Sequence, residues 1–275
     1  MIWMKQQLLG GSIGRLALSF RDKFDILHTA YFYPESVGTV ANDQLATKLV
    51  TTICQSHKTF VDVGAHIGSV ISEVANSDST IKIVAIEAIP EKIVQLRRKF
   101  PFVELHDCAV GESTGEVSFF INLRQSGYSS LRRPFRVNEL ETSEIRVPIK
   151  RLDEIVLSND IDVIKIDVEG AELGVLRGSM KILNESRPTI MFESGPQLES
   201  DLDYTKEELY EFFFSSGYVV LIPNRVAHND FGLSKDGFIE SHLYPRRTTN
   251  YFAIPKERRI EIRDRARSIL KIPIA

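Results

Sequence analysis

Residues Thr59–Gly68, TFVDVGAHIG, form the most informative stretch of this 275-residue sequence. The apolar run around Val61 is typical of a buried strand that ends in a glycine turn. Asp62 precedes two glycines, Gly64 and Gly68, which allow the backbone to turn or to approach a ligand closely. An acid in that place repels phosphate and suits a ligand with a cationic end. S-adenosylmethionine (SAM), with its ammonium and sulfonium groups and no phosphate, is such a ligand.

A second acid follows the next predicted strand, 81–86, which ends at Glu87. In doubly wound folds, an acid at this place usually binds the ribose hydroxyls of a nucleotide. Asp62 and Glu87 together therefore predict a nucleoside-type cofactor at the ends of adjacent strands. The alternative interpretation is a tight turn between strand and helix with a solvated acid.

The composition narrows the class of protein. It is 43% hydrophobic and 26% charged, and the chain is long enough for one large α/β domain with a buried core. A formal net charge of -3 argues against a nucleic-acid partner. Cys54 and Cys108 cannot form a disulfide framework, so a reducing cytoplasm is the simplest location. We find no signal-peptide pattern and no apolar run that would span a membrane.

Predicted strands and helices alternate along the chain. This order indicates an α/β fold, in which a mainly parallel sheet carries helices on both faces. A capping-box pattern at Thr205–Glu208 predicts the start of a helix that ends near Gly217. The other predicted helices are 43–54, 68–75, 90–99 and 171–183. The predicted strands are 59–63, 81–86, 103–105, 116–121, 144–149, 162–167, 189–193, 218–222 and 251–254.

Three segments follow from this pattern: an N-terminal helical or cap segment (1–58), a cofactor-binding domain (59–255) and a basic C-terminal helix (256–275). The aromatic run Tyr31–Pro34 is either packing or a surface that closes over a ligand. The tail carries seven Lys or Arg against three acids, with Ile262, Ala266 and Ile269 on one helical face. It packs on the body or on a second subunit of a homo-oligomer, or it binds an anionic surface.

The second informative stretch is Lys165–Glu172, KIDVEGAE. Lys165 and Asp167 lie two apart on a strand and share a face, and a lysine in an apolar parallel strand requires a partner. Glu169 follows where the strand ends, and ligands of open α/β sheets bind at that edge. For Glu172 alone, a helix cap or a solvated acid is the simpler interpretation. The acids that close predicted strands are Asp62, Glu87, Asp107, Asp167 and Glu193.

Together these motifs resemble the FkbM family of SAM-dependent methyltransferases. The resemblance covers roughly residues 59–193 and rests on VDVGAHIG, VAIEAIPE, HDCAVGESTG, SGYSSL, IKIDVEGAE and MFE, with TNYFAIP at 249–255 resembling the family's last strand. It implies a Rossmann-like class I methyltransferase fold, usually of seven strands with the last pair reversed, and O-methylation of a hydroxyl.

The resemblance also implies where the cofactor binds. The glycine stretch would line the methionine end, Glu87 would hold the ribose, and the stretch after the third strand would flank the adenine. One residue departs from the pattern, because His66 stands where the family commonly has asparagine. The cofactor-binding residues implied by position are Asp62, Gly64, Ala65, His66, Gly68, Glu87, Asp107, Cys108 and Ala109.

Methyl transfer to an alcohol requires a base or a metal, because the hydroxyl is a poor nucleophile until it loses its proton. Asp167 is the first candidate base, with Glu169 or Glu193 next, and Lys165 would pair with Asp167 and set its charge. Alternatively, the three acids hold Mg²⁺, which prefers oxygen ligands. His66 is a further candidate base, although a histidine in this loop more often donates a hydrogen bond.

Two other functions stay open. A nicotinamide-dependent oxidoreductase would have glycine where His66 stands, and a non-catalytic module could keep the SAM pocket without turnover. For a methyltransferase, the acceptor would be a hydroxyl of a small molecule or glycan, such as a surface sugar or a secondary metabolite. The stretches 127–130 and 224–247 supply candidate acceptor contacts, namely Tyr128, Ser129, Ser130, His228, His242, Arg246 and Arg247.

Overall fold

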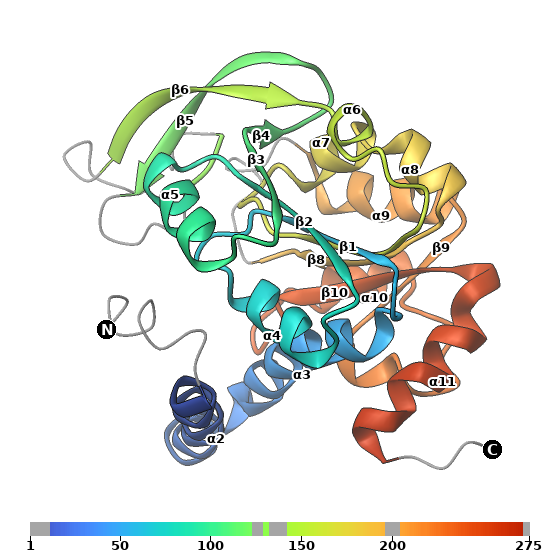
Figure 1. Ribbon diagram of the computed structural model, residues 1–275. Coiled ribbons are helices and arrows are strands. Elements are labelled where there is room, and N and C mark those ends of the chain that lie inside the picture. Colours follow the sequence, from blue (N-terminus) through green and yellow to red (C-terminus); the bar gives the residue numbers. More distant parts are fainter. Residues whose placement is uncertain (1–11, 123–128, 132–141, 196–203, 272–275) are drawn as a thin grey trace.

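The computed structural model describes residues 12–122, 129–131, 142–195 and 204–271 (Figure 1). Seven strands form one sheet in the order β3-β2-β1-β7-β8-β10-β9. Only β10 runs antiparallel to its neighbours, β8 and β9, and it lies between them, so the last pair is reversed in order. The predicted mainly parallel, seven-stranded sheet is thereby confirmed. The strands are β1 (Thr59–Val63), β2 (Lys82–Glu87), β3 (Glu104–Asp107), β7 (Ile161–Ile166), β8 (Thr189–Glu193), β9 (Tyr218–Leu221) and β10 (Asn250–Pro255).

A second, three-stranded sheet lies beyond the carboxyl ends of the main strands. It consists of β4 (Ala109–Val110), β5 (Gly115–Asn122) and β6 (Thr142–Lys150), in the order β4-β6-β5. Strands β5 and β6 form an antiparallel hairpin, which Figure 1 shows standing away from the main sheet. The hairpin is attached by apolar packing, because Phe119 and Val147 form a small core with Ile89 and Ala109.

Helices cover both faces of the main sheet, as predicted. One face carries α7 (Glu172–Arg177), α8 (Met180–Glu185), α9 (Lys206–Ser215) and α10 (Lys235–Glu240). The other carries α3 (Val37–Ile53), α4 (Ser69–Ser77), α5 (Pro90–Lys99) and α11 (Arg259–Leu270). The described residues also form α2 (Ser12–Phe32), the short α6 (Leu152–Ile155) and the 3-10 turns Pro34–Ser36, Pro223–Arg225 and Lys256–Arg258.

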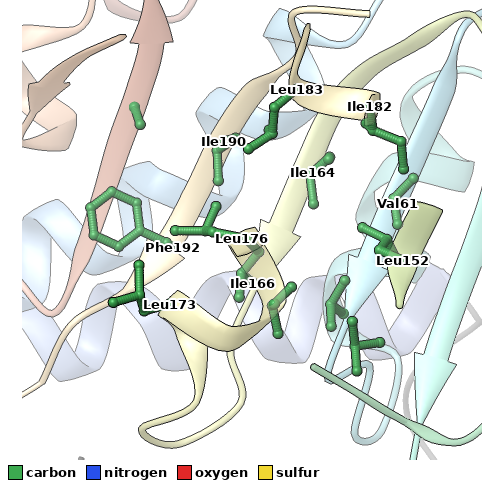
Figure 2. Packing of buried hydrophobic residues seen from close by; sticks show 14 of the residues in the cluster. Val61, Leu152, Ile164, Ile166, Leu173, Leu176, Ile182, Leu183, Ile190 and Phe192 are labelled. Carbon is green, nitrogen blue, oxygen red and sulfur yellow. The ribbon is translucent and has the colours of Figure 1, made fainter. Parts of the chain in front are cut away.

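The alternation of side chains along the strands builds two separate cores. Successive residues of a strand point to opposite faces, so Val61 packs with the α7 side while its neighbour Phe60 packs with the α3 side. Figure 2 shows the first core, in which Leu176 and Leu183 lie over the side chains of the central strands. The buried strand residues hold the strand ends, and therefore the site, in fixed positions.

The helix predicted at 171–183 is wrong as a single element, because it breaks into α7 and α8 at Gly178. A side chain at Gly178 would meet the backbone oxygen of Gly111 at 2.1 Å, so the chain passes that backbone too closely for any other residue. Ser179 then bonds back to the carbonyl of Val175 at 2.6 Å. Met180 begins the new helix and is 38% exposed.

Helices α3 and α11 pack together on one face of the sheet. Helix α3, longer than predicted, buries Leu49 and Ile53 in the second core, and α11 lies beside it with Ile262 and Ala266 fully buried. The side chain of Ile269 lies outside the described residues. Among the described residues, no helix has the length and apolar character needed to cross a bilayer.

Arginines of the C-terminal segment are committed to partners within the molecule. Asp162, at the start of β7, is almost fully buried and lies 2.5 Å from Arg258 and 3.1 Å from Arg265. It also accepts the backbone N–H of Gln55 at 2.8 Å. This carboxylate therefore joins α11 and the end of α3 to the edge of the sheet opposite the site.

We expect Asp162→Asn to lower the free energy of unfolding by about 2–4 kcal/mol, because two poorly hydrated guanidinium groups lose their counter-charge. Urea denaturation would measure this loss. Glu112→Gln is the control, since it removes an exposed ion pair with Arg177 and should cost less than about 1 kcal/mol. Equal losses in the two variants would contradict the proposed tie between α11 and the sheet.

Candidate functional site

An open cavity lies at the carboxyl ends of β1, β2 and β7, beneath the hairpin of the second sheet. Its empty volume, including the mouth, is about 660 Å³. This is the edge at which ligands of open α/β sheets bind. The sequence-predicted site residues that line it are Gly64, His66, Glu87, Cys108, Ala109, Ser129, Asp167 and Glu169.

The turn after β1 uses its glycines for close packing. Gly64 and Gly68 adopt positive φ, at 80° and 76°, as does His66 between them at 50°. A Cβ on Gly64 would meet the carbonyl oxygen of Asp167 at 1.9 Å, and one on Gly68 would meet the ring of Phe100 at 2.3 Å. Gly64 therefore brings two loops of the site together, whereas Gly68 packs against the end of α5, away from the cavity lining.

A buried cation lies beneath this turn. The Lys165 ammonium donates to the carbonyl oxygen of Gly64 at 2.7 Å and lies 3.0 Å from Asp62 and 3.4 Å from Asp167. Burial opposes the charge of Lys165, but the two carboxylates outweigh it and hold its pKa above the ordinary value. Asp62 is only 1% exposed, so it supports the turn from below and, like Lys165, is not among the residues lining the cavity.

Glu87 connects the two loops on the other side of the cavity. Its carboxylate accepts the backbone N–H of His66 at 2.6 Å, of Ala88 at 2.9 Å and of Ile89 at 2.8 Å. Burial raises the pKa of Glu87 in spite of these bonds. The side chain is therefore held in one place, facing the cavity at the end of β2.

The residues after β3 separate into two groups. Cys108 and Ala109 line the cavity, and burial raises the pKa of the Cys108 thiol. Asp107 points elsewhere, because it pairs with Arg97 on α5 at 2.5 Å. Asp107 is not among the residues lining the cavity, and its contact with the adenine stays a prediction. Ala65 is buried in the second core and also does not line the cavity.

The sequence analysis missed the apolar residues that line the cavity, among them Ile89, Phe119 and Leu131. Ile89 lies two residues after Glu87, and its position after the acid could have indicated it. Phe119 and Leu131 come from the hairpin and its loop, and only the pairing of that hairpin against the body brings them to the site. Residues Ser126–Tyr128 of the predicted acceptor loop lie outside the described residues.

Three carboxylates gather at the cavity mouth. One oxygen each of Asp167, Glu169 and Glu193 lies within 4.8 Å of the others. Burial, the negative charge of Asp167 and a hydrogen bond with it raise the pKa of Glu193 well above its ordinary value. Burial acts in the same direction on Asp167, but the charge of Lys165 and the bond from Glu193 outweigh it and lower the pKa of Asp167. Of the two carboxyl groups, Glu193 therefore binds a proton more readily than Asp167.

The loop that carries Glu169 is braced from two sides. Glu169 has a positive φ of 55°, and its carbonyl oxygen accepts the hydroxyl of Ser130 at 2.8 Å. Glu172 is 2% exposed, accepts the backbone N–H of Gly170 at 3.1 Å and accepts the hydroxyl of Tyr204 at 2.5 Å. Glu172 is thus neither a solvated acid nor a simple cap. It ties the segment after β8 to the loop that carries Asp167 and Glu169.

The stretch 224–247 is divided between two parts of the molecule. His228 lies beside α11, where its carbonyl oxygen accepts Arg259 at 2.6 Å. His242 is buried behind the end of β8, with Nε2 2.8 Å from the hydroxyl of Ser194. Arg247 lies 3.7 Å from Glu240. Only the second half of this stretch therefore adjoins the acid cluster.

The chain belongs to the FkbM methyltransferase family. The methyltransferase FkbM domain matches residues 62–220, which is more than half of the sequence. This confirms the family indicated by the motifs. The match includes the glycine turn, Glu87, the loop with Asp167 and Glu169, and Glu193.

The chain is similar to Methyltransferase 1 of Beauveria bassiana (strain ARSEF 2860), with 26% identity over 141 residues. That alignment covers 43% of this chain and 57% of the relative, so the chain spans little more than half the length of the curated relative it matches.

Among solved structures, a FkbM methyltransferase from Methylobacillus flagellatus KT has a TM-score of 0.49 and 17% identity, covering 91% of this chain and 57% of that one. A TehB-like SAM-dependent methyltransferase from Corynebacterium glutamicum ATCC 13032 Kitasato has a TM-score of 0.38 and 10% identity, covering 76% and 84%. At these scores the fold assignment rests on the strand order itself.

We expect protonation of His242 to destabilise the protein in acid. Burial lowers the pKa of His242 to about 4 from 6.5, so the unfolded chain takes up this proton first as the pH falls. The neutral ring makes its full contribution to the free energy of unfolding above pH 6.5, and this contribution is lost as the pH falls towards 4. At pH 5 the loss amounts to about 2 kcal/mol.

Urea denaturation at pH 7 and pH 5 would measure the loss. His242→Asn can still donate a hydrogen bond from its amide but has no titrating ring, so its stability should change less between the two pH values. An unchanged difference in that variant would remove His242 from the acid-sensitive groups.

Proposed function

We propose that this protein transfers a methyl group from SAM to a hydroxyl oxygen of a sugar, a glycan or a secondary metabolite. The observation that carries this proposal is the position of Asp167 and Glu193, whose pKa values are shifted in opposite directions, at the mouth of the cavity formed by the carboxyl ends of the strands. Family membership supports the reaction class, and the acid pair supports oxygen as the atom that is methylated.

The cavity suits SAM better than a dinucleotide. Glu87 at the end of β2 presents a fixed carboxylate for a ribose diol, and Ile89, Cys108 and Phe119 offer apolar walls for an adenine ring. The described lining residues include three acids and neither lysine nor arginine. Such a lining disfavours the pyrophosphate of a nicotinamide cofactor, which needs positive or N–H donor surroundings.

The chain's own part in the reaction is to orient the acceptor and remove its proton. SAM supplies a methyl group that its sulfonium makes electrophilic. A hydroxyl at the cavity mouth would lie beside the carboxylates of Asp167 and Glu193. Glu193 is the stronger base because its pKa is raised, whereas Asp167 stays ionised beside Lys165. We therefore assign proton removal to the pair, with Glu193 holding the proton and Asp167 orienting it.

Mg²⁺ is the alternative way to activate the hydroxyl, because the oxygens of Asp167, Glu169 and Glu193 lie close enough to share one ion. A non-catalytic module is the alternative to any transfer. The two differ in outcome: a metal enzyme loses turnover in EDTA and regains it with Mg²⁺, whereas a non-catalytic module binds S-adenosylhomocysteine and shows no turnover with any acceptor.

Glu87→Gln should weaken binding of S-adenosylhomocysteine by about 1–3 kcal/mol, or roughly fivefold to a hundredfold, because a charged hydrogen-bond acceptor is lost from the cavity. Calorimetric titration would measure this, with NADH as the competing class of ligand. Glu91→Gln is the matched control, an exposed acid four residues further on. Equal affinities in the Glu87 variant and the unsubstituted protein would remove Glu87 from the cofactor site.

Glu193→Gln should lower the rate of methyl transfer by about 10²–10⁴-fold, the range for losing a general base. Its affinity for S-adenosylhomocysteine should stay within a few-fold, because Glu193 does not line the cavity. Transfer of radiolabelled methyl from SAM to a panel of glycosides and hydroxylated metabolites, with EDTA and Mg²⁺ arms, would measure the rate.

The rate in the unsubstituted protein should rise with pH through the raised pKa of Glu193, because the base acts only after losing its proton. Asp167→Asn should also abolish transfer. Full turnover in either variant would contradict the assignment of the base.

A further inference from the structure

Arg246 is a half-buried cation without an acidic partner. Its Nε is buried and has no hydrogen-bond acceptor, and no carboxylate of the described residues forms an ion pair with it. The next residue, Arg247, does pair with Glu240 at 3.7 Å. A buried N–H that lacks an acceptor costs about 1–3 kcal/mol and therefore calls for an explanation.

The backbone places Arg246 near the acid cluster. Thr249, at the start of β10, accepts the N–H of Ser194 at 2.8 Å, and Ser194 directly follows Glu193. Arg246 is three residues from Thr249, a span of at most about 11 Å. Its own carbonyl oxygen accepts the hydroxyl of Thr39 on α3, which fixes this part of the turn.

Arg246 follows His242 by four residues, and His242 is bound to the end of β8. Burial lowers the pKa of His242 to about 4 and raises the pKa of Tyr251 to about 12, and the positive charge of Arg246 acts on both groups as a smaller influence that favours the neutral imidazole and the ionised phenol. The His242 ring lies 2.8 Å from the hydroxyl of Ser194 and 5.2 Å from the Tyr251 ring. The charge of Arg246 is therefore felt at the two rings that support the strand end carrying Glu193.

The nearby acids on α3 and the turn before it are committed to other groups. Asp43 accepts the hydroxyl of Thr248 and the N–H of Thr249, each at 2.8 Å. Glu35 accepts the hydroxyl of Tyr244 at 2.5 Å. These bonds leave the guanidinium of Arg246 available for an anion that comes from outside the chain.

We propose that Arg246 binds an anionic group of the methyl acceptor, a carboxylate or a phosphate, while the acceptor hydroxyl lies at Asp167 and Glu193. This inference rests on the proposed function. A guanidinium presents a planar set of donors that matches such oxyanions. The acid cluster repels the same anion, so the two charges together orient the acceptor, with its hydroxyl towards the acids and its anion towards Arg246.

The test is an NMR titration of the unsubstituted protein labelled with ¹⁵N-arginine and saturated with S-adenosylhomocysteine. The Nε–Hε resonances are followed as sodium acetate or sodium phosphate replaces sodium chloride at constant ionic strength. We expect a saturable shift at Arg246, with an apparent affinity at least tenfold tighter than at Arg98, an exposed arginine without a partner. The anion that saturates at the lower concentration identifies the acceptor's group.

Arg246→Lys and Arg98→Lys assign the two resonances, and assignment from the backbone serves if either variant fails to fold. An Arg246 resonance that stays still, or that follows Arg98, overturns the inference. Calorimetry with S-adenosylhomocysteine on the same sample separates the two proposals. Loss of that binding would count against the proposed function, whereas intact binding with a silent Arg246 would count against the anionic acceptor alone.

Discussion

The ammonium of Lys165 is the interaction on which the site depends. It lies between the central strands β1 and β7, where Asp62 and Lys165 are direct partners in the register. From there it reaches the Gly64 carbonyl and the Asp167 carboxylate, so one charge fixes the glycine turn and the acid loop together. Removing it would leave buried carboxylates uncompensated, which is far more costly than losing an exposed ion pair.

The same charge determines how protons are distributed at the cavity mouth. Asp167 stays ionised because Lys165 is beside it, and that negative charge in turn raises the pKa of Glu193. A carboxyl group whose pKa is raised beside an ionised partner can both accept and return a proton. The distribution of charge among the carboxylates at the cavity mouth therefore follows from Lys165, which lies two residues before Asp167.

Much of the main sheet could be predicted because its signals are local. Apolar runs and acids at strand ends located β1, β8 and Glu87, and the alternation of strands with helices predicted a mainly parallel sheet. The features that the sequence did not predict depend on contacts between distant segments. Asp107 turns to Arg97 on α5, and the helix break at Gly178 is set by the backbone of Gly111. Neither contact leaves a periodic trace in the sequence.

The proposed acceptor half of the site is held differently from the proposed cofactor half. It is held by single hydrogen bonds from residues outside the motifs, such as Tyr204 to Glu172 and His242 to Ser194. Bonds of this kind need only one donor and one acceptor, so they can be replaced without disturbing the sheet. The proposed cofactor half has no such freedom, because the positive φ of Gly64 and its contact with the Asp167 backbone exclude other residues. On the proposed function, one fold can therefore keep its cofactor while its acceptor changes.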